Sequence, residues 1–158
     1  MREWAAGAVA KILLRDFFDF IESVNEEWVE HPSENIRRAV AVAIKYVSKA
    51  KKEEYADSMF SLTEKLMTDD SRYVRKNVGP FALGDGLLRY CPERVLQKIE
   101  EWRQSDNGNV KWNVIKLFST AEARKYKEIA EPIVRAYGHD PDYKIRQAAN
   151  STLKTLLG

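Results

Sequence analysis

The chain has few of the residues that build covalent cross-links, metal sites or membrane spans. Its single cysteine, Cys91, excludes an internal disulfide and is typical of a reducing compartment, so we expect a cytoplasmic location. No run approaches the ~20 apolar residues that span a bilayer. A Cys/His cluster, a phosphate-binding loop and a nucleophile elbow are also missing from the sequence. We therefore expect no cofactor, no metal and no membrane partner.

Charge of either sign is nearly balanced, with 26 Lys and Arg residues against 24 Asp and Glu residues, a formal net charge of +2. This small excess does not by itself indicate a nucleic-acid-binding protein, but it allows a basic face balanced by an acidic one. The length of 158 residues, with 44% hydrophobic and 32% charged residues, is typical of a helical protein with one continuous core. We therefore expect a single domain over residues 1–158.

A short pattern occurs four times along the chain. In each copy a small polar residue is followed three positions later by Ile or Val, and then by Arg or Lys. The aliphatic anchors of this pattern are separated by 38, 36 and 35 residues, and they are Ile36, Val74, Val110 and Ile145. Repeats of this length are typical of stacked helical arrays.

The residues around each anchor predict a pair of helices joined by a short turn. Apolar residues recur four and eight positions after the anchors, which keeps one face of a helix apolar. The small polar residues are good N-caps, because a side-chain oxygen can accept a free amide of the first turn: Ser33, Ser71, Asn107 and Asp142. After a partial helix over residues 1–10, the predicted pairs are 12–30 with 34–50, 53–67 with 72–90, 92–104 with 108–119, and 122–138 with 143–157.

The spacing and the paired helices resemble HEAT-type repeats. The resemblance implies an all-α fold, a right-handed α-α solenoid (superhelix) of about four HEAT-like repeats. In that family an acidic residue of the turn and a basic residue of the second helix form a ladder between neighbouring repeats. The residues at those positions are Asp70 with Arg75, Asp106 with Lys111, and Asp140 with Arg146.

Basic residues occupy the first turn of all four predicted second helices: Arg37, Arg38, Arg75, Lys76, Lys111 and Arg146. Stacked repeats would align these cations on one side of the array, where they could follow the phosphate backbone of duplex DNA. A second interpretation stays open, in which Arg75, Lys111 and Arg146 pair with the turn aspartates. Arg38 and Lys76 lie one step round the helix and are freer to meet a ligand.

The second repeat contains a segment with poor helical preferences. Three glycines and one proline, Gly79, Pro80, Gly84 and Gly86, lie within eight residues of an otherwise helical run. Each glycine costs a helix interior roughly 1 kcal/mol and a proline about 3 kcal/mol, so we expect a kink or a close approach by another group. One interpretation is a tight helix crossing that needs small residues. The other is a functional site at Asp85, whose carboxylate lies between two glycines.

Residues on both sides of this segment resemble one group of HEAT-like proteins. The stretch 70–79, followed by the helix start at 92–93 and by Trp102, is similar to the bacterial DNA-alkylation-repair family. Residues 28–39 look like the preceding repeat of that family, and the resemblance covers about residues 25–120. It implies a protein that cradles duplex DNA on a basic concave surface. In the catalytic members, it also implies cleavage of the bond between a cationic alkylated base and its sugar.

The same resemblance suggests catalytic residues. When Pro80 is treated as a one-residue insertion, Phe81 takes the position of a Trp that follows the glycine in one branch of the family. Asp85 then takes the position of a carboxylate four residues further on. A carboxylate can stabilise a developing oxocarbenium sugar, and an aromatic face can bind a cationic base or sugar. Trp112 would be the neighbouring aromatic residue.

The leading interpretation is a DNA-binding HEAT-repeat protein of the DNA-alkylation-repair type; whether it excises alkylated purines, as a DNA glycosylase does, is left open. The alternative is a non-catalytic protein-protein interaction scaffold. The last predicted helix places Ile145, Ala149, Leu153 and Leu156 on one face, although the end of a solenoid normally needs a polar cap. That face predicts either a truncated array or an end that packs on a protein partner or a second copy.

Overall fold

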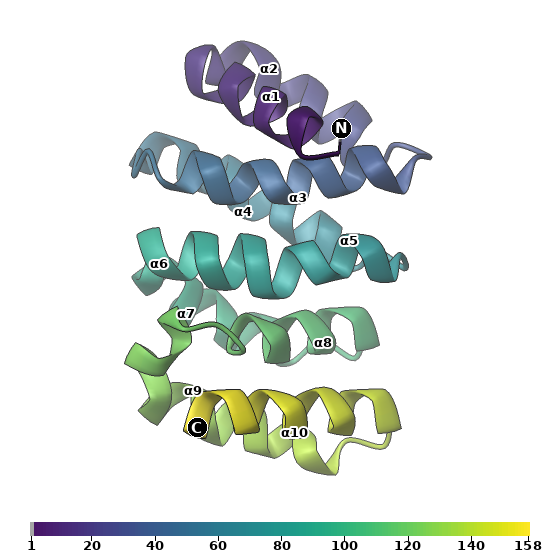
Figure 1. The fold of residues 1–158 in the computed structure, drawn as a ribbon, viewed down its shortest axis with the longest axis vertical. Helices are drawn as coiled ribbons and strands as arrows, with labels where there is room; N and C mark the ends of the chain where they lie inside the picture. Colours follow the sequence, from purple (N-terminus) through teal and green to yellow (C-terminus); the bar gives the residue numbers. More distant parts are fainter. Residues whose placement is uncertain (1) are drawn as a thin grey trace.

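A computed structural model describes residues 2–158, with side chains from residue 6 onward. Over that range the chain is all-α, with helices and no strand. The helices are stacked in chain order, with the N-terminal helices at one end and α10 (Tyr143–Leu157) at the other (Figure 1). Within the described part, no helix has both the length and the apolar character needed to cross a bilayer.

The N-terminal part contains α1 (Arg2–Arg15), α2 (Phe17–Ser23), the π-helix η1 (Val24–Trp28) and α3 (Glu34–Ser48). The break between α1 and α2 lies at Asp16, where the backbone leaves the helical region (φ −135°, ψ 57°). The sequence predicted this break nearer residue 11. The later break buries both Leu13 and Phe17, and the Phe17 ring stacks on Tyr55 with the ring centroids 3.7 Å apart.

The middle part contains α4 (Glu53–Met67), α5 (Arg72–Asn77), the π-helix η2 (Val78–Leu87) and α6 (Leu88–Tyr90). The last three follow one another without interruption, so the helix predicted over 72–90 is confirmed. Its centre is nevertheless a π-helix of 10 residues. Pro80 lies in this segment and has no amide hydrogen to donate to the carbonyl four residues earlier, so one hydrogen bond of the α-helical pattern is missing there.

The C-terminal part contains α7 (Pro92–Trp102), α8 (Gly108–Leu117), the 3₁₀ helix η3 (Glu122–Tyr126), α9 (Lys127–Ala136), the 3₁₀ helix η4 (Tyr137–His139) and α10. These boundaries agree with the predicted helices to within about two residues, the usual uncertainty of a helix end. We call α3, the run α5–η2–α6, α8 and α10 the second helices. The first helices are α2–η1, α4, α7 and α9.

Three of the four predicted N-caps are confirmed. Ser71 Oγ and Asn107 Oδ1 each accept two backbone amides of the following turn, and Asp142 Oδ1 accepts one. The fourth, Ser33, occupies the predicted N-cap position with the capping backbone conformation, but its side chain makes no capping hydrogen bond. Its amide instead donates to His31 Nδ1 at 3.0 Å.

The second helices pack in sequence against one another. α3 contacts α1 on one side and α5 and η2 on the other, and α8 lies between η2 and α10 (Figure 1). The residues four positions after the anchors are fully buried in this packing: Val40, Val78, Val114 and Ala149. The predicted apolar face of the second helices is therefore confirmed.

The apolar face of α10 is buried within the chain. Ile145, Ala149 and Leu156 are buried and Leu153 is half-buried, because α10 packs against α8, α9 and η4. This face is therefore already covered within the chain. Tyr143 and Leu157 are the large hydrophobic residues of α10 that stay exposed.

Candidate nucleic-acid interface

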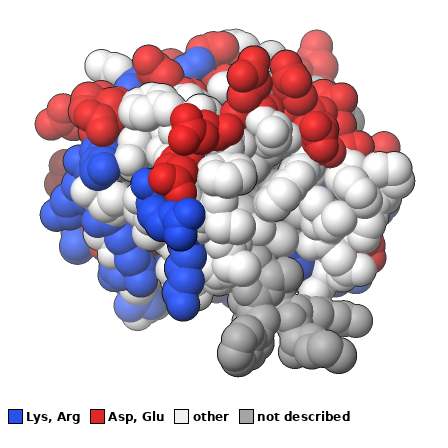
Figure 2. Space-filling model, turned by 90° about the horizontal axis from the view of Figure 1, so that it is seen from above, with Lys and Arg blue, Asp and Glu red and all other residues white. Residues whose placement is uncertain are grey.

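Several helices carry charged residues of one sign only. α2 and η1 together carry four acidic residues and no basic one: Asp19, Glu22, Glu26 and Glu27. α8 and α10 carry only basic residues among their charged side chains: Lys111, Lys116, Lys144, Arg146 and Lys154. From the α1–α2 end of the stack, Lys and Arg gather on one side of the molecule, and Asp and Glu along another (Figure 2). The basic face predicted as one possibility is therefore present.

A groove of about 650 Å³ runs over α5, α8 and α10 on the basic face. It is lined by five cationic side chains: Arg72, Arg75, Lys76, Lys116 and Lys144. Asp142 is the single carboxylate of the lining, and the indole of Trp112 forms part of its wall. Because a concave surface lined by one sign of charge concentrates its field, this groove attracts anions more strongly than the net charge suggests.

Two of the predicted DNA-binding cations hold neighbouring helix pairs together. Arg37 Nε lies 2.6 Å from Asp69 Oδ2, and Lys111 Nζ lies 2.9 Å from Asp140 Oδ2. In both pairs the carboxylate comes from the turn of the following helix pair. Lys111 thus pairs with a turn aspartate, as the second interpretation predicted, but with Asp140 in place of Asp106. Arg37 makes the same kind of pair, and both cations are mostly buried.

The Lys111 ion pair changes the titration of its carboxylate. Burial by itself raises the pKa of Asp140, because it disfavours the charged form. Hydrogen bonds from Lys111 and from the Asp142 amide outweigh that effect, so the pKa of Asp140 lies below the ordinary aspartate value of 3.8. The folded protein therefore favours the ionised form of this carboxylate.

Arg75 is held by an amide side chain in place of a carboxylate. Its guanidinium donates to Asn109 Oδ1, and Asn109 Nδ2 donates in turn to Asp70 Oδ1 at 3.0 Å. The predicted contact between Arg75 and Asp70 is thus relayed through Asn109. The Arg75 guanidinium also lies 5.9 Å from the centre of the Trp112 ring. Both side chains line the groove.

The remaining predicted cations have different surroundings. Arg146 donates to the backbone carbonyls of residues 140 and 141 at 2.7 and 2.8 Å. The Arg38 guanidinium lies 5.0 Å from the centre of the Tyr73 ring, and its buried Nε has no hydrogen-bond partner. Lys76 is exposed and lines the groove. Of the six predicted DNA-binding residues, Arg75 and Lys76 lie in the groove.

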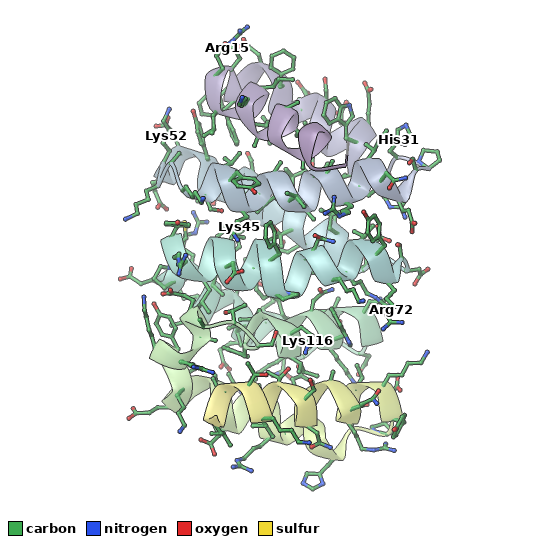
Figure 3. All side chains as sticks on the ribbon, in the orientation of Figure 1. Arg15, His31, Lys45, Lys52, Arg72 and Lys116 are labelled. Atoms are coloured by element: carbon green, nitrogen blue, oxygen red, sulfur yellow. The ribbon has the colours of Figure 1, made fainter. Side chains whose placement is uncertain are left out.

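The predicted ring and carboxylate of η2 lie around a cation from α3. Lys45 Nζ is 3.8 Å from the centre of the Phe81 ring and 3.5 Å from Asp85 Oδ2. Figure 3 shows Lys45 between α3 and the run α5–η2–α6. The structure thus brings Phe81 and Asp85 together, with an ammonium of the chain itself at the place of a cationic ligand. Trp112 lies apart from this cluster, in the groove.

The glycines of η2 are required by close helix packing. Gly79 faces α8, and Gly84 faces the end of α8 and the turn after it, where a Cβ atom would lie 2.6 Å from the carbonyl oxygen of Leu117 and 2.5 Å from Thr120 Cγ2. Gly86 faces α3, where a Cβ atom would lie 3.0 Å from Lys45 Cα. The tight-crossing interpretation of this segment is therefore confirmed.

Sequence reasoning missed three of the groove residues: Arg72, Lys116 and Lys144. Arg72 and Lys144 precede the anchors of their helices, Val74 and Ile145, whereas the predicted DNA-binding residues were chosen only among those that follow the anchors. Lys116 lies four residues after Trp112 and so shares its helix face, a relationship that could have been read from the sequence. Figure 3 shows Lys116 between η2 and α10, with Arg72 at one end of α5.

Comparisons with known proteins found no relative of this chain. No family model, no curated protein and no solved structure matches the chain. The described residues also contain no group of three or more His, Cys, Asp or Glu side chains that could hold a metal ion. Any function must therefore be argued from the groove and its surroundings.

Proposed function

We propose that the protein is a HEAT-like α-α solenoid of the DNA-alkylation-repair type that binds duplex DNA through the basic face of its second helices. The anchor spacing of 35 to 38 residues and the stacked helix pairs support the architecture. The cross-pair contacts Arg37–Asp69 and Lys111–Asp140 support it further, because a ladder between repeats is a feature of the HEAT resemblance.

The groove over α5, α8 and α10 is the observation that carries the proposal. Duplex DNA has one negative charge per ~1.7 Å of helix axis, and cations that contact phosphates release the condensed counterions. The groove offers five cations against one carboxylate, and no ion pair is described for Arg72, Lys76, Lys116 or Lys144. A polyanion therefore gains from these side chains without breaking an ion pair of the described structure.

The proposal does not include base excision. An alkylated base or a developing oxocarbenium sugar would need the space between the Phe81 ring and the Asp85 carboxylate. The ammonium of Lys45 already contacts both the ring and the carboxylate and supplies the positive charge there. Excision by Phe81, Asp85 and Trp112 stays a prediction that an assay must test.

A protein-interaction scaffold is the second candidate, and one surface favours it. Four large apolar side chains are exposed on α1 and α2, at the end of the stack: Ile12, Leu14, Phe18 and Phe20. Phe18 is the most exposed of them, at 64%. A partner protein would cover these side chains and would not need the groove. Substitution of groove residues should therefore weaken DNA binding if the first candidate is right, and should have no such effect if the protein is only a scaffold.

Fluorescence anisotropy of a labelled duplex at low salt tests the proposal. We expect Lys76→Gln and Lys144→Gln each to weaken binding and to lower the slope of log K against log salt by about 1, the value for one lost phosphate contact. Lys127→Gln is the matched control, because Lys127 is exposed on α9 and lies outside the groove. Absence of binding at low salt, or equal weakening by the control, would refute the proposal.

A further inference from the structure

Lys116 is chemically distinct from the other lysines of the groove. It is half-buried, and its Nζ lies 3.4 Å from the hydroxyl oxygen of Thr152, with no ion pair described for it. Lys76 and Lys144, by contrast, are exposed. Burial lowers the pKa of Lys116 below the ordinary lysine value of 10.5. More of this amine is therefore neutral near physiological pH, and the neutral amine is the nucleophilic form.

The position of Lys116 gives this amine access to a ligand in the groove. Lys116 and Trp112 lie on one face of α8, one turn apart, and both line the groove. Ser151 of α10 lines the opposite wall. An indole in a nucleic-acid groove can stack on bases, and it can also fill the gap where a base is missing.

We propose that Lys116 is a nucleophile for the aldehyde of abasic sites in DNA. This inference rests on the proposed function, because it needs the sugar-phosphate backbone in the groove. Intact nucleotides have no free aldehyde, whereas a sugar that has lost its base opens to one at C1′. The ligand class is thus set by three features together: cations for the phosphates, an indole for the vacant base position, and a half-buried amine beside that indole for the aldehyde.

The reaction is the formation of an imine, and it balances without any cofactor. The lone pair of Lys116 Nζ attacks C1′ of the open sugar and forms a carbon–nitrogen bond. The two amine protons and the aldehyde oxygen leave as one water molecule, so no oxidant or reductant takes part. Addition of water reverses the step and restores the amine, which makes the complex a reversible covalent one.

Reductive trapping tests the inference on the full chain. The protein is incubated with a duplex that carries one abasic site, in the presence of sodium cyanoborohydride, which reduces an imine to a stable secondary amine. We expect a covalent protein–DNA adduct that peptide mass spectrometry maps to Lys116. Lys116→Arg, which keeps the charge but not the nucleophile, should lose the adduct. Lys127→Arg should keep it, because Lys127 lies outside the groove.

A parallel anisotropy titration separates the two proposals. If the duplexes bind but no adduct forms, or if the adduct maps to other amines and survives Lys116→Arg, the nucleophile assignment is overturned and DNA binding stands. If neither the intact nor the abasic duplex binds at low salt, the proposed function fails and this inference fails with it. Mapping on the unmodified chain does not depend on the folding of any variant, and circular dichroism checks the folding of both variants.

Discussion

The ammonium of Lys45 lies 3.8 Å from the centre of the Phe81 ring. The same nitrogen is 3.5 Å from Asp85 Oδ2, so one cation from α3 satisfies both an aromatic face and a carboxylate of η2. This contact occurs beside Gly86, where a Cβ atom would lie 3.0 Å from Lys45 Cα. The cluster therefore combines the close packing of α3 against η2 with an ion pair and a cation–π contact.

Lys45→Met keeps the length of the side chain and removes its charge. We expect the free energy of unfolding to fall by about 1 kcal/mol, because the Phe81 ring loses its cation and Asp85 its partner. Urea denaturation measures the change. Lys11→Met is the control, since Lys11 is exposed on α1 and has no described ion pair, and it should change stability little. Equal losses in the two variants would mean that the cluster contributes nothing.

Base excision can be measured directly with a duplex that contains 7-methylguanine. We expect the wild-type chain to release no free base, because the Lys45 ammonium already contacts both the Phe81 ring and the Asp85 carboxylate. Chromatography of the supernatant detects any released base. Release that disappears in Asp85→Asn would contradict this expectation and restore the catalytic assignment of Phe81 and Asp85.

Gly84→Ala tests the tight crossing of η2 and α8. The added Cβ would lie 2.5 Å from Thr120 Cγ2 and 2.6 Å from the carbonyl oxygen of Leu117, so η2 or the backbone at the end of α8 must shift. We expect a loss of about 2 kcal/mol in the free energy of unfolding, as is usual for overpacking. Thermal or urea denaturation provides the measurement.

Gly138→Ala is the matched control for Gly84→Ala. No atom lies within 4 Å of a Cβ at Gly138, and its backbone does not have a positive φ angle. The substitution should therefore be neutral or stabilising by about 0.5 kcal/mol, through a smaller entropy of the unfolded chain. If Gly138→Ala destabilised the protein as much as Gly84→Ala, the close approach to α8 would not be the cause.

The Asp140–Lys111 pair predicts a dependence of stability on pH. The pKa of Asp140 is lower in the folded protein than its ordinary value of 3.8, so the folded state prefers the ionised carboxylate. This contribution is complete above that value and is lost as the pH falls through the lower folded pKa. Asp140→Asn should thus destabilise the protein near neutral pH, and the difference from wild type should shrink as the pH falls below 3.8.

Urea titrations between neutral pH and about pH 3 measure this dependence. Asp106→Asn is the control, because Asp106 is exposed and has no described partner. It should change stability little at any of these pH values. A constant difference between Asp140→Asn and wild type over the whole range would show that ionisation of Asp140 has no part in its contribution.

The helix pairs were predictable from the sequence because their causes are local. The apolar steps around the anchors define helix faces, and residues such as Ser71, Asn107 and Asp142 cap a helix through atoms two or three positions away. The helices and caps that the structure confirms all depend on residues that are close together in the sequence. The π-helical form of η2 was not predicted, although Pro80 had suggested some departure from a regular helix.

The candidate site was less predictable, because its contacts join separate helices. Arg37 and Asp69 are 32 residues apart, and their pairing depends on how one helix pair is rotated against the next. Lys45 was missed for the same reason, since it belongs to α3 while the ring and carboxylate belong to η2. The repeat length predicts that the helices stack, but it does not predict which side chains of neighbouring helices come into contact.

The gathering of charges of one sign on several helices has a consequence for the approach to DNA. With a net charge of only +2, the protein as a whole attracts a polyanion weakly, so the proposed binding would depend on the local field of the groove. Salt screens that field beyond about 10 Å at 0.1 M. The proposed attraction would therefore act only when the groove already faces the duplex, and the acidic side chains of α2 and η1 would disfavour an approach from their own side.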